Sequence, residues 1–563
     1  MEKRALLAFV LSLGVVLLWE VFVAPRITPQ APVQQTAQQE PASQSPKTTA
    51  VKDGKAPFVK TEGDSKTSLE AIPQAHAQAQ PVPIKVWEVD TPLYTARVAS
   101  AGARLQSFQL KKHRQAVDPH SPPMDLIPAH GAGYYPLAVD FLKHPQWSLA
   151  TRNFESQAPQ RIAIQPNDKE ALLTLTAEEP GKVRVTKVFR FAADTYTVQV
   201  DVIVENLGAQ GFTDRVGISS YAVPFEAKQS RYNQMRVSVL QNGKLENLNE
   251  KKLGKETPVF KPPVQWMGYQ DNYFLQAIVP LKQDHYQLVP RLVDQKLGLV
   301  QMVLLTDPFE LAPGSKAVIP AQYYFGPKEM AHLKLADHNL DRALDFGWFT
   351  VIAKPLLVFL KWLNNYTQNY GIAIIILTII IKILFWPLTH KSYKSMQVMK
   401  KIQPKMAQIR EKYKDDREKL NQELMMLYRT YKVNPLGGCL PMVLQIPVFF
   451  ALYRMLYGAI ELRHQPFWLW INDLTAPDRL DVGFNIPYLG HGLPVLTLLM
   501  GVSMFVQQKM TPSSGDPRQE KMMLLMPVIF TVFFINFPSG LVLYWLVNNV
   551  LSIVQQYWIN RTV

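Results

Sequence analysis

The chain is almost without cysteine and lacks the short motifs of common catalytic sites. Cys439 is the only cysteine in 563 residues, which excludes an internal disulfide framework and a metal site built from several cysteines. No GxxxxGK[ST] phosphate loop, HExxH zinc motif or GxSxG nucleophile motif is present. The sequence therefore gives no support to nucleotide hydrolysis or peptide-bond cleavage. We expect a protein that is not an enzyme and that uses no cofactor and no metal.

Acidic residues are also scarce. The chain holds 45 Asp and Glu against 60 Lys and Arg, which gives a formal net charge of +15. Such a surplus can indicate nucleic-acid binding, but here the basic residues flank long apolar runs, where they set membrane topology. We therefore expect contact with a lipid bilayer and no direct sequence-specific nucleic-acid binding.

The first 83 residues predict a membrane anchor followed by a tether. Residues 1–25 begin with two basic side chains and continue into a mostly apolar run. Pro25 stands where cleavage after Ala24 would have to occur, so we predict an uncleaved span with a cytoplasmic N-terminus; a cleaved signal peptide is the alternative. Residues 26–83 are rich in Gln, Pro, Ala, Thr and Ser, which predicts a disordered tether.

Residues 84–330 predict an all-β, sandwich-like domain. Runs such as YTARVA, KVRVTKVFRF and YTVQVDVIVEN alternate apolar and polar residues, and turns separate them. Many such runs without an intervening helical pattern indicate a β-sandwich. We find no catalytic constellation in this segment. Its histidines lack metal-ligand spacing, and we interpret them as solvated surface residues: His113, His120, His130, His144 and His285.

Residues 340–365 predict an amphipathic helix that lies in the membrane interface. An apolar stripe recurs at helical spacing at Trp348, Ile352, Leu356, Phe359 and Leu363. Two lysines, Lys354 and Lys361, fall on another face, a pattern typical of interfacial helices. An additional membrane-spanning helix is the alternative.

Residues 366–563 predict a polytopic α-helical core with five spans, which makes six with the anchor. The spans are expected at about 370–387, 439–460, 491–508, 522–537 and 540–559. The loop from Lys391 to Lys432 holds 12 basic and 5 acidic residues, a balance of 12 − 5 = +7, which places it in the cytoplasm. The loop from Glu461 to Gly490 has a balance of 2 − 4 = −2 and belongs outside. Both termini are then cytoplasmic, and the β domain is periplasmic in a double-membrane bacterium.

The basic loop itself, residues 390–434, predicts a cytoplasmic helical hairpin. Apolar residues recur at spacings of three and four in two stretches, and Asp415 with Glu418 resembles a capping box at the start of the second helix. Methionine suits adaptable binding surfaces, although such stripes also serve as plain packing. The candidate substrate contacts are Met396, Met399, Met406, Met425 and Met426.

Polar side chains recur within the apolar spans. Thr378 and Lys382 share a helix face, as do Asn548, Ser552 and Gln555 further along the chain. Gln445, Thr497, Ser503, Gln507 and Trp545 add further candidates. Such groups are tolerated only against protein or water, so several together indicate a hydrophilic groove, with hydrogen bonds between helices as the alternative.

Two of the spans are short. The runs 372–385 and 493–506 would each extend about 21 Å as helices, less than the roughly 30 Å of hydrocarbon in a bilayer. We therefore expect a locally thinned membrane. Lys382 lies four residues before Trp386 and could instead extend to the cytoplasmic surface, so spacing alone leaves its role open.

Three runs then resemble a known family: NPLGGCLPMVLQIPVFFALYRML at 434–456, FWPLT at 385–389 and MPVIFTVFFINFPSGLVLYW at 526–545. Together with the hairpin they resemble the YidC/Oxa/Alb family of membrane protein insertases. The likeness is dense from residue 341 onward, and the anchor, tether and β domain match the layout of Gram-negative members. It implies five core spans around a groove that opens to the cytoplasm and to lipid, and a hairpin that receives substrates.

The resemblance also implies roles and partners. The groove of the family usually carries an arginine, and Lys382 stands at the matching position, which keeps the charge and loses the bidentate fork. Thr378 matches another groove position, and Trp545 falls where an aromatic side chain contacts substrate. The implied partners are nascent integral membrane proteins, the Sec translocon, and the ribosome with signal recognition pathway components. The C-terminal tail stops at Val563, without the basic extension of some relatives, which weakens a ribosome contact at that end.

Two rival interpretations stay open. A solute transporter or channel with a periplasmic binding domain would also have six spans, but the spans lack the carboxylates that ion-coupled transporters commonly use and show no inverted repeat. A periplasmic binding module that merely uses the spans as an anchor would depend on residues 84–320 for its function.

Overall fold

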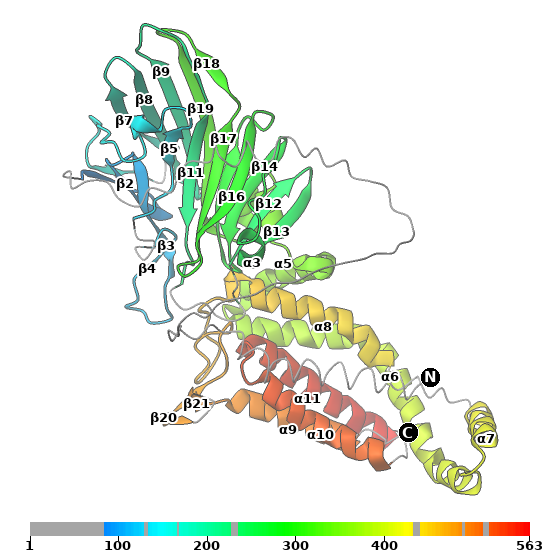
Figure 1. Ribbon diagram of the computed structural model, residues 1–563. Coiled ribbons are helices and arrows are strands. Elements are labelled where there is room, and N and C mark those ends of the chain that lie inside the picture. The colour runs from blue at the N-terminus through cyan, green and yellow to red at the C-terminus, as the bar shows by residue number, and fades with distance from the viewer. Residues whose placement is uncertain are drawn as a thin grey trace, which may run out of the picture. The chain divides into compact units, whose positions relative to one another are not determined.

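The computed structural model describes residues 84–128, 133–165, 168–226, 233, 235–431, 440–486, 490–510 and 517–562 (Figure 1). The expected anchor at 1–25 and the expected tether at 26–83 lie outside the described residues. The described chain divides into a strand-rich segment up to β19 and a helical segment that follows it.

The strand-rich segment carries nineteen strands in the described ranges. Its strands are β1 (Val86–Asp90), β2 (Tyr94–Ala99), β3 (Arg104–Arg114), β4 (Pro123–Asp125), β5 (Ala138–Phe141), β6 (Arg161–Ala163), β7 (Glu170–Glu179), β8 (Val183–Ala192), β9 (Thr197–Asn206), β10 (Phe212–Asp214), β11 (Val216–Ala222), β12 (Arg236–Gln241), β13 (Lys244–Leu248), β14 (Val264–Gln270), β15 (Phe274–Pro280), β16 (Tyr286–Asp294), β17 (Leu299–Thr306), β18 (Phe309–Leu311) and β19 (Lys316–Pro327). Short helices η4 (Pro145–Trp147) and α3 (Glu250–Leu253) interrupt them.

Three larger sheets and a two-stranded sheet, β10-β18, build this segment into a β-sandwich. An eight-stranded sheet has the order β13-β12-β14-β15-β19-β9-β8-β7, a four-stranded sheet the order β16-β17-β11-β5, and a five-stranded sheet the order β4-β3-β2-β1-β6. Gln276 on β15 donates to Ser220 Oγ on β11 at 2.9 Å, so the eight-stranded and four-stranded sheets face each other. Strands β11, β15 and β17 are buried along their whole length because both of their faces are covered. The predicted sandwich is confirmed.

Strand β8 shows how the alternation in the sequence becomes burial. Its odd-numbered side chains, from Val183 to Phe191, point into the core, while its even-numbered ones are half-exposed. Lys187 falls on the buried face and is fully enclosed. Its Nζ donates to the carbonyl oxygens of Gly102 at 2.6 Å, Ala103 at 3.3 Å and Leu137 at 2.5 Å, which satisfies all three N–H groups of the ammonium.

The histidines of the domain do not all behave as expected. His120 and His285 are exposed, His113 and His144 are not, and His130 lies outside the described residues. The prediction of a solvated surface residue is wrong for His144 because its Nδ1 lies 2.6 Å from the buried carboxylate of Asp214. It is wrong for His113 because the ring is half-buried against the edge of another aromatic ring.

The helical segment begins after β19. Its elements are α4 (Met330–Leu335), η5 (Leu340–Ala343), η6 (Gly347–Phe349), α5 (Thr350–Thr367), α6 (Tyr370–Lys412), α7 (Arg417–Thr430), α8 (Leu440–Gly458), η8 (Ile460–Leu462), β20 (Leu480–Ile486), β21 (Gly490–Leu493), α9 (Val495–Met510), α10 (Pro517–Phe534) and α11 (Ser539–Thr562). Helix α11 packs against α6 and α9, α10 packs against α9, and α5 packs against α6 and α8 (Figure 1).

Helix α6 differs from the expected boundary. The expected span at 370–387 and the first helix of the hairpin form one helix of 43 residues, about 65 Å long, with Pro387 and Pro404 inside it. The second hairpin helix, α7, begins one residue later than expected, because Asp416, not Asp415, caps it by accepting a hydrogen bond from Lys419 N at 3.0 Å.

The number of membrane spans is only partly supported. Within the described ranges, α6 is the one helix that is both long and apolar enough to cross a membrane by length and composition. Val495–Met510 and Met523–Phe534 are apolar but shorter. Six spans therefore stay a prediction.

Helix α5 has two unlike faces, and the expected stripe at Trp348–Leu363 spreads over both of them. The buried side chains are Ala353, Leu357, Leu360 and Leu363, and the exposed apolar ones include Val351, Val358, Trp362 and Tyr366. The two lysines of α5 were expected on another face than the stripe, and both are half-buried. Lys361 Nζ lies 2.8 Å from Glu329 Oε1, just after β19, and 3.2 Å from Glu461 Oε1 on η8.

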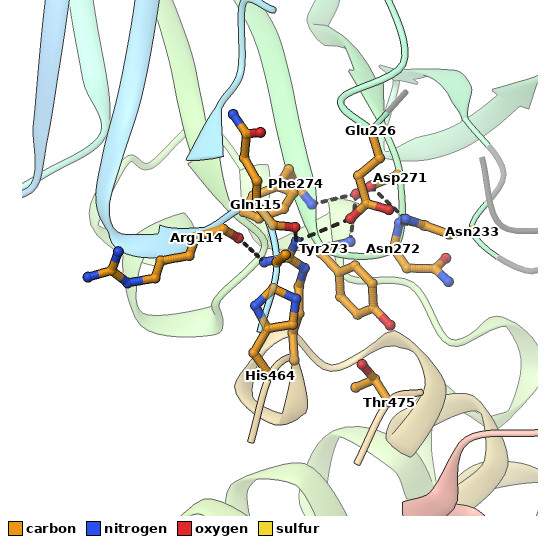
Figure 2. A network of polar contacts seen from close by, with 12 residues as sticks. Arg114, Gln115, Glu226, Asn233, Asp271, Asn272, Tyr273, Phe274, His464 and Thr475 are labelled. Carbon is orange, nitrogen blue, oxygen red and sulfur yellow. Dashed lines mark hydrogen bonds and ion pairs between the residues drawn. The ribbon is translucent and has the colours of Figure 1, made fainter. Parts of the chain in front are cut away.

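A second polar junction joins the sandwich to the loop after α8 (Figure 2). The buried guanidinium of Arg463 donates to the carbonyl oxygens of Arg114 at 2.8 Å and Gln115 at 3.3 Å. It also pairs with Glu226 Oε1 at 3.1 Å and lies 5.2 Å from the centre of the Phe274 ring. We call these five residues the Arg463 junction. It was not expected from the sequence.

Candidate substrate-contact site in the helical core

Lys382 lies inside the bundle, where three helices meet. Its side chain is 7% exposed, and its Nζ donates to Ser552 Oγ at 2.6 Å and to Asn548 Oδ1 at 3.4 Å, both on α11. The ammonium therefore points toward α11 and not along α6 toward Trp386. No carboxylate in the described part of the chain forms an ion pair with it.

The third helix of this cluster is α8. Gln445 Nε2 donates to Asn548 Oδ1 at 2.9 Å, so one amide oxygen accepts from both Gln445 and Lys382. The hydroxyl of Ser552 donates to the carbonyl oxygen of Asn548 one turn earlier, at 2.7 Å. We call Lys382, Gln445, Asn548 and Ser552 the Lys382 cluster. Among the described residues, both partners of the ammonium are neutral, and two acceptors serve three N–H groups, so the positive charge is not neutralised and one N–H group has no acceptor.

The remaining candidates lie around the cluster without joining it. Thr378 is buried, and its hydroxyl donates to Ile374 O of its own helix at 2.7 Å. Trp545 is half-buried among aromatic rings, with centroids 4.7 Å from Phe449 and 4.9 Å from Phe534. Gln507 lies half-buried on α9.

Polar contacts continue along α11 on both sides of the cluster. Gln555 Nε2 donates to Thr389 Oγ1 on α6 at 2.8 Å, and Asn549 Nδ2 donates to Ser503 Oγ on α9 at 3.1 Å. Sequence reasoning missed Thr389 and Asn549. Thr389 lies seven residues, two helical turns, after Lys382, and this spacing is the signal that could have identified it.

The methionines of the hairpin occupy three environments. Met396 and Met399 are half-buried, and Met406 is buried. Met425 and Met426 on α7 are 54% and 60% exposed. Met406 therefore serves packing within the hairpin in this structure, and the exposed apolar surface of the hairpin is carried by α7.

These features define a class of protein: a membrane-embedded helical bundle with a charged polar interior and an external β-sandwich, without a constellation for bond chemistry among the described residues. Residues 86–359 match the family described as YidC periplasmic domain, and residues 362–563 match the 60Kd inner membrane protein family.

Full-length relatives agree with these matches. The membrane protein insertase YidC of Syntrophobacter fumaroxidans is 54% identical over 100% of both chains, and that of Syntrophus aciditrophicus is 41% identical, also over 100% of both. A crystal structure of an active YidC insertase with its first transmembrane domain resolved shares 20% identity, with a TM-score of 0.35, over 84% of this chain and 94% of that chain.

The chain belongs to the YidC family of membrane protein insertases. It is an inner-membrane protein with a periplasmic domain, and it acts as an insertase and chaperone of membrane proteins, not as an enzyme. The transporter alternative is not favoured.

Proposed function

We propose that the Lys382 cluster is the point at which the polar part of an incoming membrane protein is held while it crosses the bilayer. The observation that supports this role is the pairing of a buried ammonium with neutral partners only. Removing an ammonium from water costs several kcal/mol even after relaxation, and hydroxyl and amide dipoles offset only part of that cost. A carboxylate or a backbone carbonyl of the substrate would complete the hydrogen bonding of Lys382.

The surrounding residues fit a path for the substrate. A hydrophobic nascent segment first contacts the hairpin. Met425 and Met426 on α7 provide exposed apolar surface for this contact, and the half-buried Met396 and Met399 on α6 line the base of the hairpin. The polar flank then enters a hydrophilic groove beside Lys382. The other groove residues are Thr378, Trp545, Gln445, Asn548, Ser552 and Gln507.

The energy of this process comes from partitioning. Each apolar substrate segment gains about 25 cal/mol for every Å² that it moves from water into lipid. Membrane potential adds about 2.3 kcal/mol per charge per 100 mV for acidic flanks. No nucleotide is needed in this scheme.

The proposal includes a topology and partners. Six spans, with the termini and the hairpin in the cytoplasm and α5 in the membrane interface, would place the Lys382 cluster within a thinned bilayer. We propose that the chain inserts small proteins alone and larger ones beside the Sec translocon. The net charge of +7 on the hairpin loop favours contact with the ribosome and the signal recognition pathway.

A charge series at Lys382 tests the central step. We expect Lys382→Arg to support insertion, Lys382→Met to lower it about tenfold for substrates with acidic translocated flanks, and Lys382→Glu to lower it further. Lys391→Glu is the matched control, because Lys391 is an exposed lysine nine residues along the same helix. Insertion is read from protease protection of radiolabelled substrates after depletion of the wild-type protein. Normal insertion of every substrate by Lys382→Glu would refute the proposal.

A further inference from the structure

The loop between η8 and β20 displays two large apolar side chains at its tip. Trp468 is 58% exposed and Leu469 is 85% exposed. Leu469 also has a φ of +58°, a left-handed conformation that a leucine rarely adopts. A soluble loop would gain nothing from holding these side chains in water.

Hydrogen bonds within the loop fix this display. Phe467 N donates to Ile471 O at 2.9 Å, and Ile471 N donates back to Trp468 O at 3.2 Å, which closes a tight turn around the tip. The Phe467 and Trp468 rings stack with centroids 4.9 Å apart, and Ile471 is buried. These contacts within the loop therefore hold Trp468 and Leu469 in an exposed position.

The loop is hydrogen-bonded to the residue that caps the first turn of α6. Asn369 caps that helix through Gly371 N at 2.8 Å, and its Nδ2 donates to Phe467 O at 3.2 Å. The fit is close, because a Cβ added to Gly371 would lie 2.0 Å from the Phe467 ring. Helix α6 is the described helix long and apolar enough to cross a membrane, and in the topology proposed above its first turn lies at the outer edge of the bilayer.

Helix α5 also has exposed aromatic side chains near the start of α6. It ends at Thr367, two residues before Asn369, and near that end Trp362 and Tyr366 are 49% and 73% exposed. Exposed Trp and Tyr side chains at the end of a spanning helix are typical of the membrane interface. Exposed aromatic side chains therefore occur both at the loop tip, which is bonded to the cap of α6, and at the end of α5, which precedes α6 in the chain.

We propose that the tip formed by Trp468 and Leu469 is a lipid anchor that inserts into the outer leaflet of the membrane. Its binding partner is the interfacial region of the bilayer itself. The anchor fixes the level of the first turn of α6, and Lys382 lies eleven residues after Gly371, about 16 Å deeper along the helix. That is near the middle of a hydrocarbon core of roughly 30 Å. Anchoring does not depend on what Lys382 does, although it sets the depth at which Lys382 acts.

The test uses the single cysteine of the chain. Replacing Cys439 with Ser gives a cysteine-free background, into which Leu469→Cys is introduced and labelled with the polarity-sensitive dye NBD. Asn472→Cys is the matched control, because Asn472 is an exposed polar residue of the same loop. Both proteins are reconstituted into vesicles of phosphatidylethanolamine and phosphatidylglycerol.

We expect the label at 469 to be blue-shifted, to be quenched by lipids that carry a doxyl group near the headgroup, and to be shielded severalfold from aqueous iodide relative to the label at 472. Equal iodide quenching at 469 and 472 would overturn the proposal. Trp468→Cys provides a second reporter if Leu469→Cys does not fold. Lys382→Met should leave these signals unchanged, so loss of the anchor and loss of the Lys382 role are distinguishable.

Discussion

Replacing Arg463 with alanine should release the β-sandwich from the helical core at the Arg463 junction. The side chain is buried, so its removal leaves the carbonyl oxygens of Arg114 and Gln115 without their charged donor. It also leaves Glu226 without its cation and uncovers the face of the Phe274 ring.

The magnitude follows from these contacts. Hydrogen bonds from a charged donor contribute about 1.5–3 kcal/mol each, and water entering the gap recovers part of that. The pair with Glu226 adds less, about 1 kcal/mol, because the Glu226 side chain is 34% exposed and solvent screens it. We expect a total near 3 kcal/mol, which corresponds to roughly a hundredfold increase in the population that is open at this junction.

Amide hydrogen exchange of the full-length protein in lipid nanodiscs measures this opening. The informative amides are those of Gln115 and Ala116, which bond across the β3–β4 turn, and those of the loop after Arg463. Arg479→Ala is the matched control, since Arg479 lies in the same loop and donates to the turn between α10 and α11. Unchanged exchange at Gln115 in Arg463→Ala, or an equal rise in Arg479→Ala, would refute the reasoning.

Three further outcomes are expected. Burial and the nearby Arg463 guanidinium lower the pKa of both His113 and His464 to about 4 from the usual value near 6.5. The open junction therefore takes up protons at a higher pH than the closed one, and docking should weaken as the pH falls from about 6.5 to 4. Amide exchange at the junction should rise over this pH range, and glutamine at both positions should remove the pH dependence. Asp416→Ala removes the cap of α7 and should cost about 1 kcal/mol of local helix stability, seen as faster exchange in α7 while β8 is unaffected. Gly371→Ala places a methyl group against the ring of Phe467 and should increase the iodide accessibility of the labelled loop tip, whereas an unchanged signal would contradict the close fit.

The patterns that could be predicted from the sequence are those that a single element carries. Alternation along β8 and β9 predicted buried and exposed faces that the structure reproduces. The polar face of α11 likewise indicated Asn548 and Ser552 as neighbours. In each case the period of the element decides which side chains share a face, and no partner has to be known.

What the sequence could not supply is the choice between partners far apart in the chain. Spacing gives the position of Lys382 along α6 but not whether its ammonium points to the surface or to another helix. The packing of α11 determines this direction, because Ser552, 170 residues later, accepts the hydrogen bond. Arg463 meets Glu226 across 237 residues and has no local pattern. The continuation of α6 through Pro387 was missed for another reason: proline disfavours a helix interior locally, while the surrounding sequence continues a helical pattern through it.

Two of the three buried lysines in the described residues, Lys187 and Lys382, allow a role in folding to be distinguished from a role in insertion. Lys187 donates to three carbonyl oxygens, which uses all of its N–H groups. Lys187→Met should leave those acceptors unpaired, at a cost of about 1–3 kcal/mol each before relaxation. Amide exchange should then rise across β8 and β9. Lys382 donates to two neutral side chains and keeps spare capacity. Lys382→Met removes a buried charge of the core and should leave exchange in α6 and α11 near wild type while insertion falls. If Lys382→Met instead loosened both helices, the lysine would be a packing residue like Lys187, and its neutral surroundings would carry no functional meaning.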